Sequence, residues 1–416
     1  FNTLGMPTST TVSLVFELLG GTFILAVLKV AADPNLAFSD LLNTDKALSV
    51  IIAIFVSVAI AFVFGIIVQW LSRIVFTFNY KRHSRYSIAI FGGIAFTALA
   101  YFIFLKGIAK SHYIAEDVRT WVEANTQMLL LATFVGSSIV MEVLHLLRVN
   151  IFRLIVLMGT FALAMAFAGN DLVNFIGVPL AGLDSYNDYV ANSGGVGVSN
   201  FMMDSLNGSA QTPPVYLFAA GVVMIVAMAT SKKAQNVIKT SVDLARQDEG
   251  DEMFGSSRAA RSIVRVTQES SSWIDSRFNK EEAELNEGAA FDVVRAAINL
   301  VLASLLITVG TNYKLPLSTT YVTFMVAMGS SLADRAWSRE SAVFRVTGVI
   351  SVIGGWFITA GVAFVSCAIV CIIMYYGGIV AKIAFMALVV FLLIRSNRKY
   401  AEKEKDADKE DVFRLM

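Results

Sequence analysis

The stretch Pro316-Leu317-Ser318-Thr319-Thr320 decides the fold of this chain, because Pro7-Thr8-Ser9-Thr10-Thr11 repeats its pattern near the first residue. Aligning the two prolines gives an offset of 309 residues (316 minus 7), and this offset also superposes Gly20 on Gly329. A proline ends the preceding helix, and a Ser or Thr behind it can cap a new one. The new helix then offers backbone N–H groups, hydroxyl donors and the positive end of its dipole. Together these suit an anion.

Composition places both copies in a membrane. Hydrophobic residues make up 56% of the 416 residues, charged residues make up 16%, and the mean hydropathy is +0.66. A soluble domain of this size is less apolar. Runs long enough to cross hydrocarbon include 48–70, 86–104, 128–147 and 343–374. We therefore expect an all-α, polytopic membrane protein with about eight to ten crossings, and the net charge of +1 gives no reason to expect a nucleic-acid partner.

The positions of Lys and Arg predict the orientation. Basic clusters follow several apolar runs, and cytoplasmic loops carry an excess of such residues. The clusters are Lys81 with Arg82 and Arg85, Arg148 with Arg153, Lys232 with Lys233, Arg335 with Arg339 and Arg345, and Arg395 with Arg398 and Lys399. With these clusters inside, the first hydroxyl segment runs outward and the second runs inward. The two copies are then antiparallel, as in an inverted repeat.

Duplicated broken helices near the bilayer midplane indicate the binding site of a secondary transporter. We therefore expect an inverted-repeat transporter fold with broken or re-entrant helices in a cell membrane (inner or plasma). Four segments are predicted. They are 1–76 as the remainder of the N-terminal repeat, 77–150 as linking transmembrane helices, 151–396 as the C-terminal repeat with a cytoplasmic loop at 231–290, and 397–416 as a charged cytoplasmic tail.

A second motif carries ionisable and carboxamide side chains at membrane depth. It reads Gly169-Asn170-Asp171-Leu172-Val173-Asn174-Phe175-Ile176-Gly177. An Asp inside a membrane is costly, so it is expected to line a cavity or to hold an ion. The carboxylate and carboxamide oxygens are hard ligands of the kind a small cation prefers, and the glycines would permit the backbone to break. A simple helix cap, in which Asn170 and Asp171 turn the chain, is the alternative reading of these residues.

Taken together, the Asn-Asp-x-x-Asn motif and the two Pro-x-Ser-Thr-Thr segments resemble the inorganic phosphate transporter (PiT) family. The resemblance spans the first residues to about Trp337. It implies cation-coupled phosphate symport through two inverted repeats, each with one copy of both motifs. It also implies that phosphate contacts the hydroxyl triplets and the Asn-Asp motif, namely Ser9, Thr10, Thr11, Ser318, Thr319, Thr320, Asn170 and Asp171. The coupled Na⁺ or H⁺ would be served by Asp171, Asn170 and Asn174.

This chain departs from the family pattern in three respects, one of which is Leu172 and Val173 where the family usually has Val and Ala. Val12 and Tyr321 stand where the family usually has a His after the hydroxyl triplet. The Asn-Asp motif of the first repeat is expected to precede Phe1, so we read the chain as lacking the N-terminal part of that repeat. We expect the chain without that part not to transport.

The expected partners are inorganic phosphate, Na⁺ or H⁺ and the lipid bilayer, with a possible homo-oligomer and no other cofactor. We expect a transporter and not an enzyme. A sulfate or other oxyanion permease of the same architecture stays open, because hydroxyl triplets recognise shape more than protonation state. A passive anion channel is a remoter alternative and would not need Asp171. A metalloenzyme built on the Glu142 and His145 pair would require metal at that pair.

Overall fold

The computed structural model describes residues 8–33, 35–78, 85–105, 114–198, 201, 213–231, 257–268, 292–315, 317–335 and 339–415. Within these ranges the chain is helical and contains no strand. The helices are α1 (Thr10–Ala32), α2 (Phe38–Leu41), α3 (Thr44–Val75), α4 (Arg85–Ala100), the π-helix η3 (Tyr101–Leu105), α6 (Glu116–Ala124), α7 (Thr126–Leu146), α8 (Ile151–Asn192), α9 (Pro214–Thr230), α11 (Arg258–Gln268), α13 (Val293–Asn312), α14 (Thr319–Ala333) and α15 (Arg339–Leu415).

Seven helices in the described ranges are long and apolar enough to cross a membrane. They are α1, α3, α4 with η3, α7, α8, α13 and the apolar part of α15. The predicted runs at 48–70, 86–104, 128–147 and 343–374 all lie on or within a residue of these helices. The expected all-α, polytopic membrane protein is confirmed.

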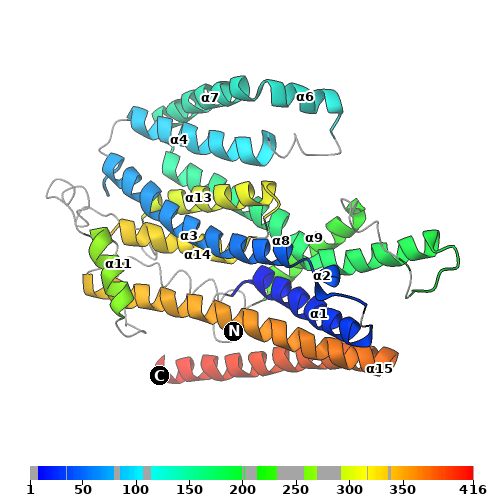
Figure 1. The fold of residues 1–416 in the computed structure, drawn as a ribbon. Coiled ribbons are helices and arrows are strands. Elements are labelled where there is room, and N and C mark those ends of the chain that lie inside the picture. The colour runs from blue at the N-terminus through cyan, green and yellow to red at the C-terminus, as the bar shows by residue number, and fades with distance from the viewer. Residues whose placement is uncertain are drawn as a thin grey trace.

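Helix α15 is two helices joined by a reversal. Gly378 has φ 55° and ψ −140°, a backbone conformation that interrupts a helix and that L side chains rarely adopt. Figure 1 shows the chain running along α15 in one direction (orange) and returning beside itself (red). Apolar residues stand on both sides of this glycine, so the segment can cross the membrane twice. The segment predicted as a charged tail, 397–416, continues the second helix as far as Leu415.

Each helix that begins with a hydroxyl triplet packs against a helix from the other end of the chain. The first copy begins α1, which packs against α15, and the second copy begins α14, which packs against α3 (Figure 1). Gly20 on α1 meets the backbone of Phe364 on α15, and Gly329 on α14 meets the backbone of Phe62 on α3. A Cβ at either glycine would collide with the carbonyl oxygen of that Phe. The two contacts are equivalent, because Gly20 and Gly329 are related by the motif offset.

Helices α1 and α14 run in opposite directions. On α14, Gly329 lies beside Phe62 and Asp334 lies beside Arg73, so α14 runs parallel to α3. Figure 1 shows α1 and α3 as successive antiparallel helices, which makes α14 antiparallel to α1. This is the arrangement that the loop charges predicted. At about 1.5 Å per residue, the 15 residues of α14 rise about 22 Å, less than the ~30 Å hydrocarbon core.

The predicted cytoplasmic loop at 231–290 is described only at Ser231 and at 257–268. There α11 packs against α15, and the Ser257 backbone N–H donates to the Thr347 hydroxyl. The rest of that loop lies outside the described residues, as do both motif prolines, Pro7 and Pro316.

Candidate functional site

Both hydroxyl triplets lie at helix N-termini and cap them in the same way. Ser9 is the N-cap of α1, and its hydroxyl oxygen accepts from the Val12 backbone N–H at 3.1 Å. Ser318 is the N-cap of α14, and it accepts from the Tyr321 N–H at 3.1 Å. The capping predicted from the sequence is therefore confirmed in both copies. In each helix the first amide groups have no carbonyl partner within the helix, so they can serve an anion.

The Asn-Asp motif lies in the middle of α8 and reaches both helix starts. The Thr319 hydroxyl donates to the Asp171 carboxylate, with distances of 2.9 and 3.1 Å to its two oxygens. The Asn174 carboxamide donates to the Thr11 hydroxyl at 3.1 Å. One helix thus touches the N-terminus of α1 and the N-terminus of α14, which come from opposite directions. The motif sits where the two antiparallel copies meet.

Two carboxamides extend this hydrogen-bonded cluster. Asn174 also donates to the carbonyl oxygen of the Asn170 side chain at 3.1 Å. Asn170 is 6% exposed and donates to the hydroxyl of Thr311 on α13 at 3.2 Å. Sequence analysis missed Thr311, because a lone Thr at the end of an apolar run has no motif around it. The polar groups in these contacts are hydroxyls, carboxamides and one carboxylate.

Two of the predicted hydroxyl residues neither cap a helix nor bond to α8 in the described contacts. Thr10 is exposed on the first turn of α1, and Thr320 is half-buried at the matching position of α14. Ser9, Thr11, Ser318 and Thr319 are instead buried to 2% exposure or less. Each triplet therefore supplies one capping hydroxyl and one buried hydroxyl that bonds to α8. Thr10 and Thr320 lie in the first turn of their helices and are more exposed.

The backbone does not break at the Asn-Asp motif, although its glycines would permit a break. Helix α8 runs without interruption for 42 residues, through Gly169 and Gly177 and past Pro179. The alternative of a helix cap at Asn170 and Asp171 is excluded as well, because both residues lie in the helix interior. Neither glycine is in close contact with another segment, so neither is needed for close approach. Each hydroxyl triplet, in contrast, stands at the start of a helix.

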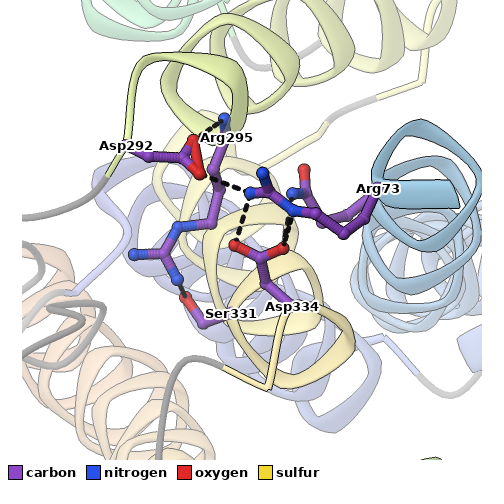
Figure 2. A network of polar contacts seen from close by, with 6 residues as sticks. Arg73, Asp292, Arg295, Ser331 and Asp334 are labelled. Atoms are coloured by element: carbon purple, nitrogen blue, oxygen red, sulfur yellow. Dashed lines mark hydrogen bonds and ion pairs between the residues drawn. The ribbon is translucent and has the colours of Figure 1, made fainter. Parts of the chain in front are cut away.

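A second polar cluster, which sequence analysis also missed, lies at the end of α14 (Figure 2). Arg73, from the last turn of α3, donates to Asp334 through Nε at 2.6 Å and Nη2 at 2.8 Å, and it pairs with Asp292 as well. Arg295 donates to the Ser331 hydroxyl at 3.1 Å. Both arginines and Asp334 are completely buried, and Asp292 is 8% exposed. Single charged residues near helix ends look like ordinary interface residues, so their convergence was not predictable.

The second cluster combines charges of both signs. Arg73 and Arg295 lie beside two carboxylates, the buried Arg345 also acts electrostatically on Arg295, and Gln69 adds a donor to Asp334 at 3.0 Å. Asp334 lies beyond the last residue of α14. Burial by itself would raise the pKa of its carboxyl group, but the guanidinium groups of Arg73 and Arg295 and the hydrogen bond from Gln69 together hold the pKa below its ordinary value. Arg73 therefore forms ion pairs with both Asp334 and Asp292.

Glu142 and His145 both lie on α7, as their spacing required. No group of three or more His, Cys, Asp and Glu side chains in the described part of the chain is placed to hold a metal ion. The metal-dependent alternative gains no support from this geometry.

No family model matches this sequence, and neither a curated protein nor a solved structure matches it significantly.

Proposed function

We propose that this protein is a secondary active transporter that takes up inorganic phosphate together with Na⁺ or H⁺ across a cell membrane. One observation carries the proposal. Asp171 and Asn174, on a single membrane helix, contact hydroxyl groups at the N-termini of two antiparallel helices that carry the same motif. Binding sites of inverted-repeat transporters lie at such junctions, where helix starts can hold an anionic group.

The hydrogen-bonding state of Thr11 suits a phosphate oxygen. A hydroxyl has one proton to donate and two lone pairs to accept with. Thr11 accepts from Asn174, so its own proton stays available. Amide N–H groups at the start of α1 and α14 add further donors. A site made of such donors binds phosphate without a fixed guanidinium clamp, which favours release on the other side.

Thr319 is in the opposite state, and this supports coupling to a cation. Its single proton is given to the Asp171 carboxylate. A phosphate oxygen would have to compete for that proton. It would also face the carboxylate charge, and two like charges 4 Å apart repel by about 4 kcal/mol at an effective dielectric constant of 20. A Na⁺ ion or a proton on Asp171 removes both obstacles, so phosphate binds well only after the cation.

Uptake of radiolabelled phosphate into proteoliposomes tests the proposal. The intact protein is reconstituted with and without an inward Na⁺ gradient or an inward pH gradient. Gradient-driven uptake that Asp171→Asn abolishes is the expected result. Asp184→Asn, a matched change farther along α8, should leave uptake intact. If uptake were the same with and without either gradient, and the same in the wild type and in Asp171→Asn, the result would contradict symport and favour a channel. Equal competition by sulfate would instead make the cargo any tetrahedral oxyanion.

A further inference from the structure

The buried charges at the end of α14 join two pairs of helices. The contact between Arg73 and Asp334 lies within the α3–α14 pair, which Gly329 and Phe62 already hold together. The other contacts leave that pair. Arg73 also reaches Asp292, the N-cap of α13, and Arg295 on α13 reaches Ser331 on α14 (Figure 2). Helix α13 packs along α8, which carries Asp171.

Within the described residues, the positions equivalent to this ionic cluster in the other copy do not repeat it. The equivalent contacts Gly20–Phe364 and Gly329–Phe62 relate α3 to α15 by an offset of 302 residues (364 minus 62). That offset places Tyr375 at the position of Arg73, and the motif offset places Leu25 at the position of Asp334. Tyr375 is 50% exposed and Leu25 is 41% exposed, and neither can form the ion pair. The repeat symmetry is therefore broken, at the end that loop charge assigns to the cytoplasm.

Helix α14 connects the site with this end of the fold. Helix α14 leads from Thr319, which binds Asp171, to Asp334, and nearly all of its side chains are buried. Buried ion pairs resist partial opening, since removing one partner leaves an uncompensated charge. When water enters and hydrates both partners, that penalty disappears. The cluster therefore favours two states, one closed and dry and one open and wet.

We propose that the ion pair of Arg73 with Asp292 and the hydrogen bond of Arg295 to Ser331 form a cytoplasmic latch. The latch holds the α3–α14 pair against the α8–α13 pair and closes the cytoplasmic route from the anion site. Opening breaks these two contacts and leaves the Arg73–Asp334 pair inside the α3–α14 unit. This inference rests on the proposed function. In it, Arg73, Asp292 and Arg295 are positioning residues that do not touch the transported ion.

Asp292→Asn tests the latch selectively. One oxygen of Asp292 accepts from the Arg295 backbone N–H at 2.8 Å to cap α13, and an Asn caps equally well. The substitution therefore removes the carboxylate that faces Arg73 and preserves the helix start. Asp45→Asn, on the exposed first turn of α3, is the matched control for loss of a carboxylate.

The readout is the reaction of a buried thiol from the cytoplasmic side. Ser304, fully buried on α13 between Arg295 and Thr311, is changed to Cys in a protein whose Cys367 and Cys371 are replaced by Ser. A membrane-impermeant maleimide is then added to inside-out vesicles. In Asp292→Asn the labelling rate should rise about tenfold, the effect expected from losing one charge-assisted bond in a two-state equilibrium. Asp45→Asn should label at the parent rate.

Ser331→Ala provides a second arm that removes the other contact and should also raise labelling. If Asp292→Asn does not fold, Ser331→Ala decides the outcome. Unchanged labelling in the variants that fold would overturn the latch, even if their thermal stability falls, because a purely structural cluster predicts that pattern. The assay needs no substrate. Faster labelling of the latch variants, in a protein that takes up no phosphate, would therefore support the latch and refute the proposed function. Unchanged labelling of these variants, in a protein that does take up phosphate, would refute the latch and leave the proposed function standing.

Discussion

Thr319 can donate its one hydroxyl proton either to Asp171 or to a bound anion, and Thr319→Val removes that choice. Val nearly preserves the shape of Thr and eliminates the donor. In the cation-free state the Asp171 carboxylate then loses a hydrogen bond whose two distances are 2.9 and 3.1 Å. A cation that reaches this carboxylate no longer displaces a donor. The variant should therefore bind the cation more tightly and phosphate more weakly.

The size of both effects follows from the charge of the acceptor. A hydrogen bond to a charged group contributes about 1.5–3 kcal/mol, which corresponds to about a tenfold to hundredfold change in an equilibrium constant. Thr319→Val should lower the cation concentration for half-maximal phosphate uptake by about tenfold or more. It should raise the phosphate concentration for half-maximal uptake by a similar factor. Thr11→Val should raise only the phosphate value, because Thr11 contacts the Asn174 carboxamide and not the carboxylate.

Initial rates of phosphate uptake into proteoliposomes, measured over a matrix of Na⁺ or H⁺ and phosphate concentrations, give both constants. Thr323→Val is the control, since that hydroxyl donates to the backbone carbonyl oxygen of Thr319 at 2.6 Å within the helix. It should leave both constants within about twofold, as for a surface change. The competition would be refuted if Thr319→Val and Thr11→Val changed the cation constant equally, or if neither changed it.

Three further substitutions test the frame around the site. Gly329→Ala should destabilise the protein by about 1–3 kcal/mol in thermal unfolding, because the added methyl group collides with the Phe62 carbonyl; Gly361→Ala on α15, where the space is open, should not. Asp334→Asn should lower the free energy of unfolding by about 3–5 kcal/mol, because it leaves the buried Arg73 guanidinium poorly compensated. Asp33→Asn, at the exposed end of α1, is its control and should change the free energy of unfolding little. Ser318→Ala should cost about 1 kcal/mol through loss of the cap of α14, and an unchanged unfolding temperature would show that the cap does not stabilise the helix.

Much of the architecture was predictable, because its signals are local. Long apolar runs predicted the membrane helices, and the Ser of each hydroxyl triplet predicted the two caps. Loop charge predicted that the two copies run in opposite directions. The reversal at Gly378 was hidden, since apolar residues continue on both sides and only the positive φ of one glycine marks the turn.

The pairing of the helices was not predictable, because it depends on contacts between distant segments. Gly20 is suited to Phe364 and Gly329 to Phe62, but nothing near any of these residues identifies its partner. The site was predicted in part for the same reason. The motifs identified Asp171 and the hydroxyl triplets, whereas Thr311 and the Arg73 cluster emerge only when α3, α13 and α14 converge.

The central claim is that phosphate binds well only after a cation has neutralised Asp171, and equilibrium binding tests it most directly. Radiolabelled phosphate is titrated onto the purified, intact protein in a Na⁺-free neutral buffer, in Na⁺ and at acidic pH, with Asp171→Asn beside the wild type. The account predicts that Na⁺ or acid tightens wild-type binding by about tenfold or more. It also predicts that Asp171→Asn binds phosphate tightly under all three conditions. Equal phosphate affinity of the wild type in every buffer would contradict the account.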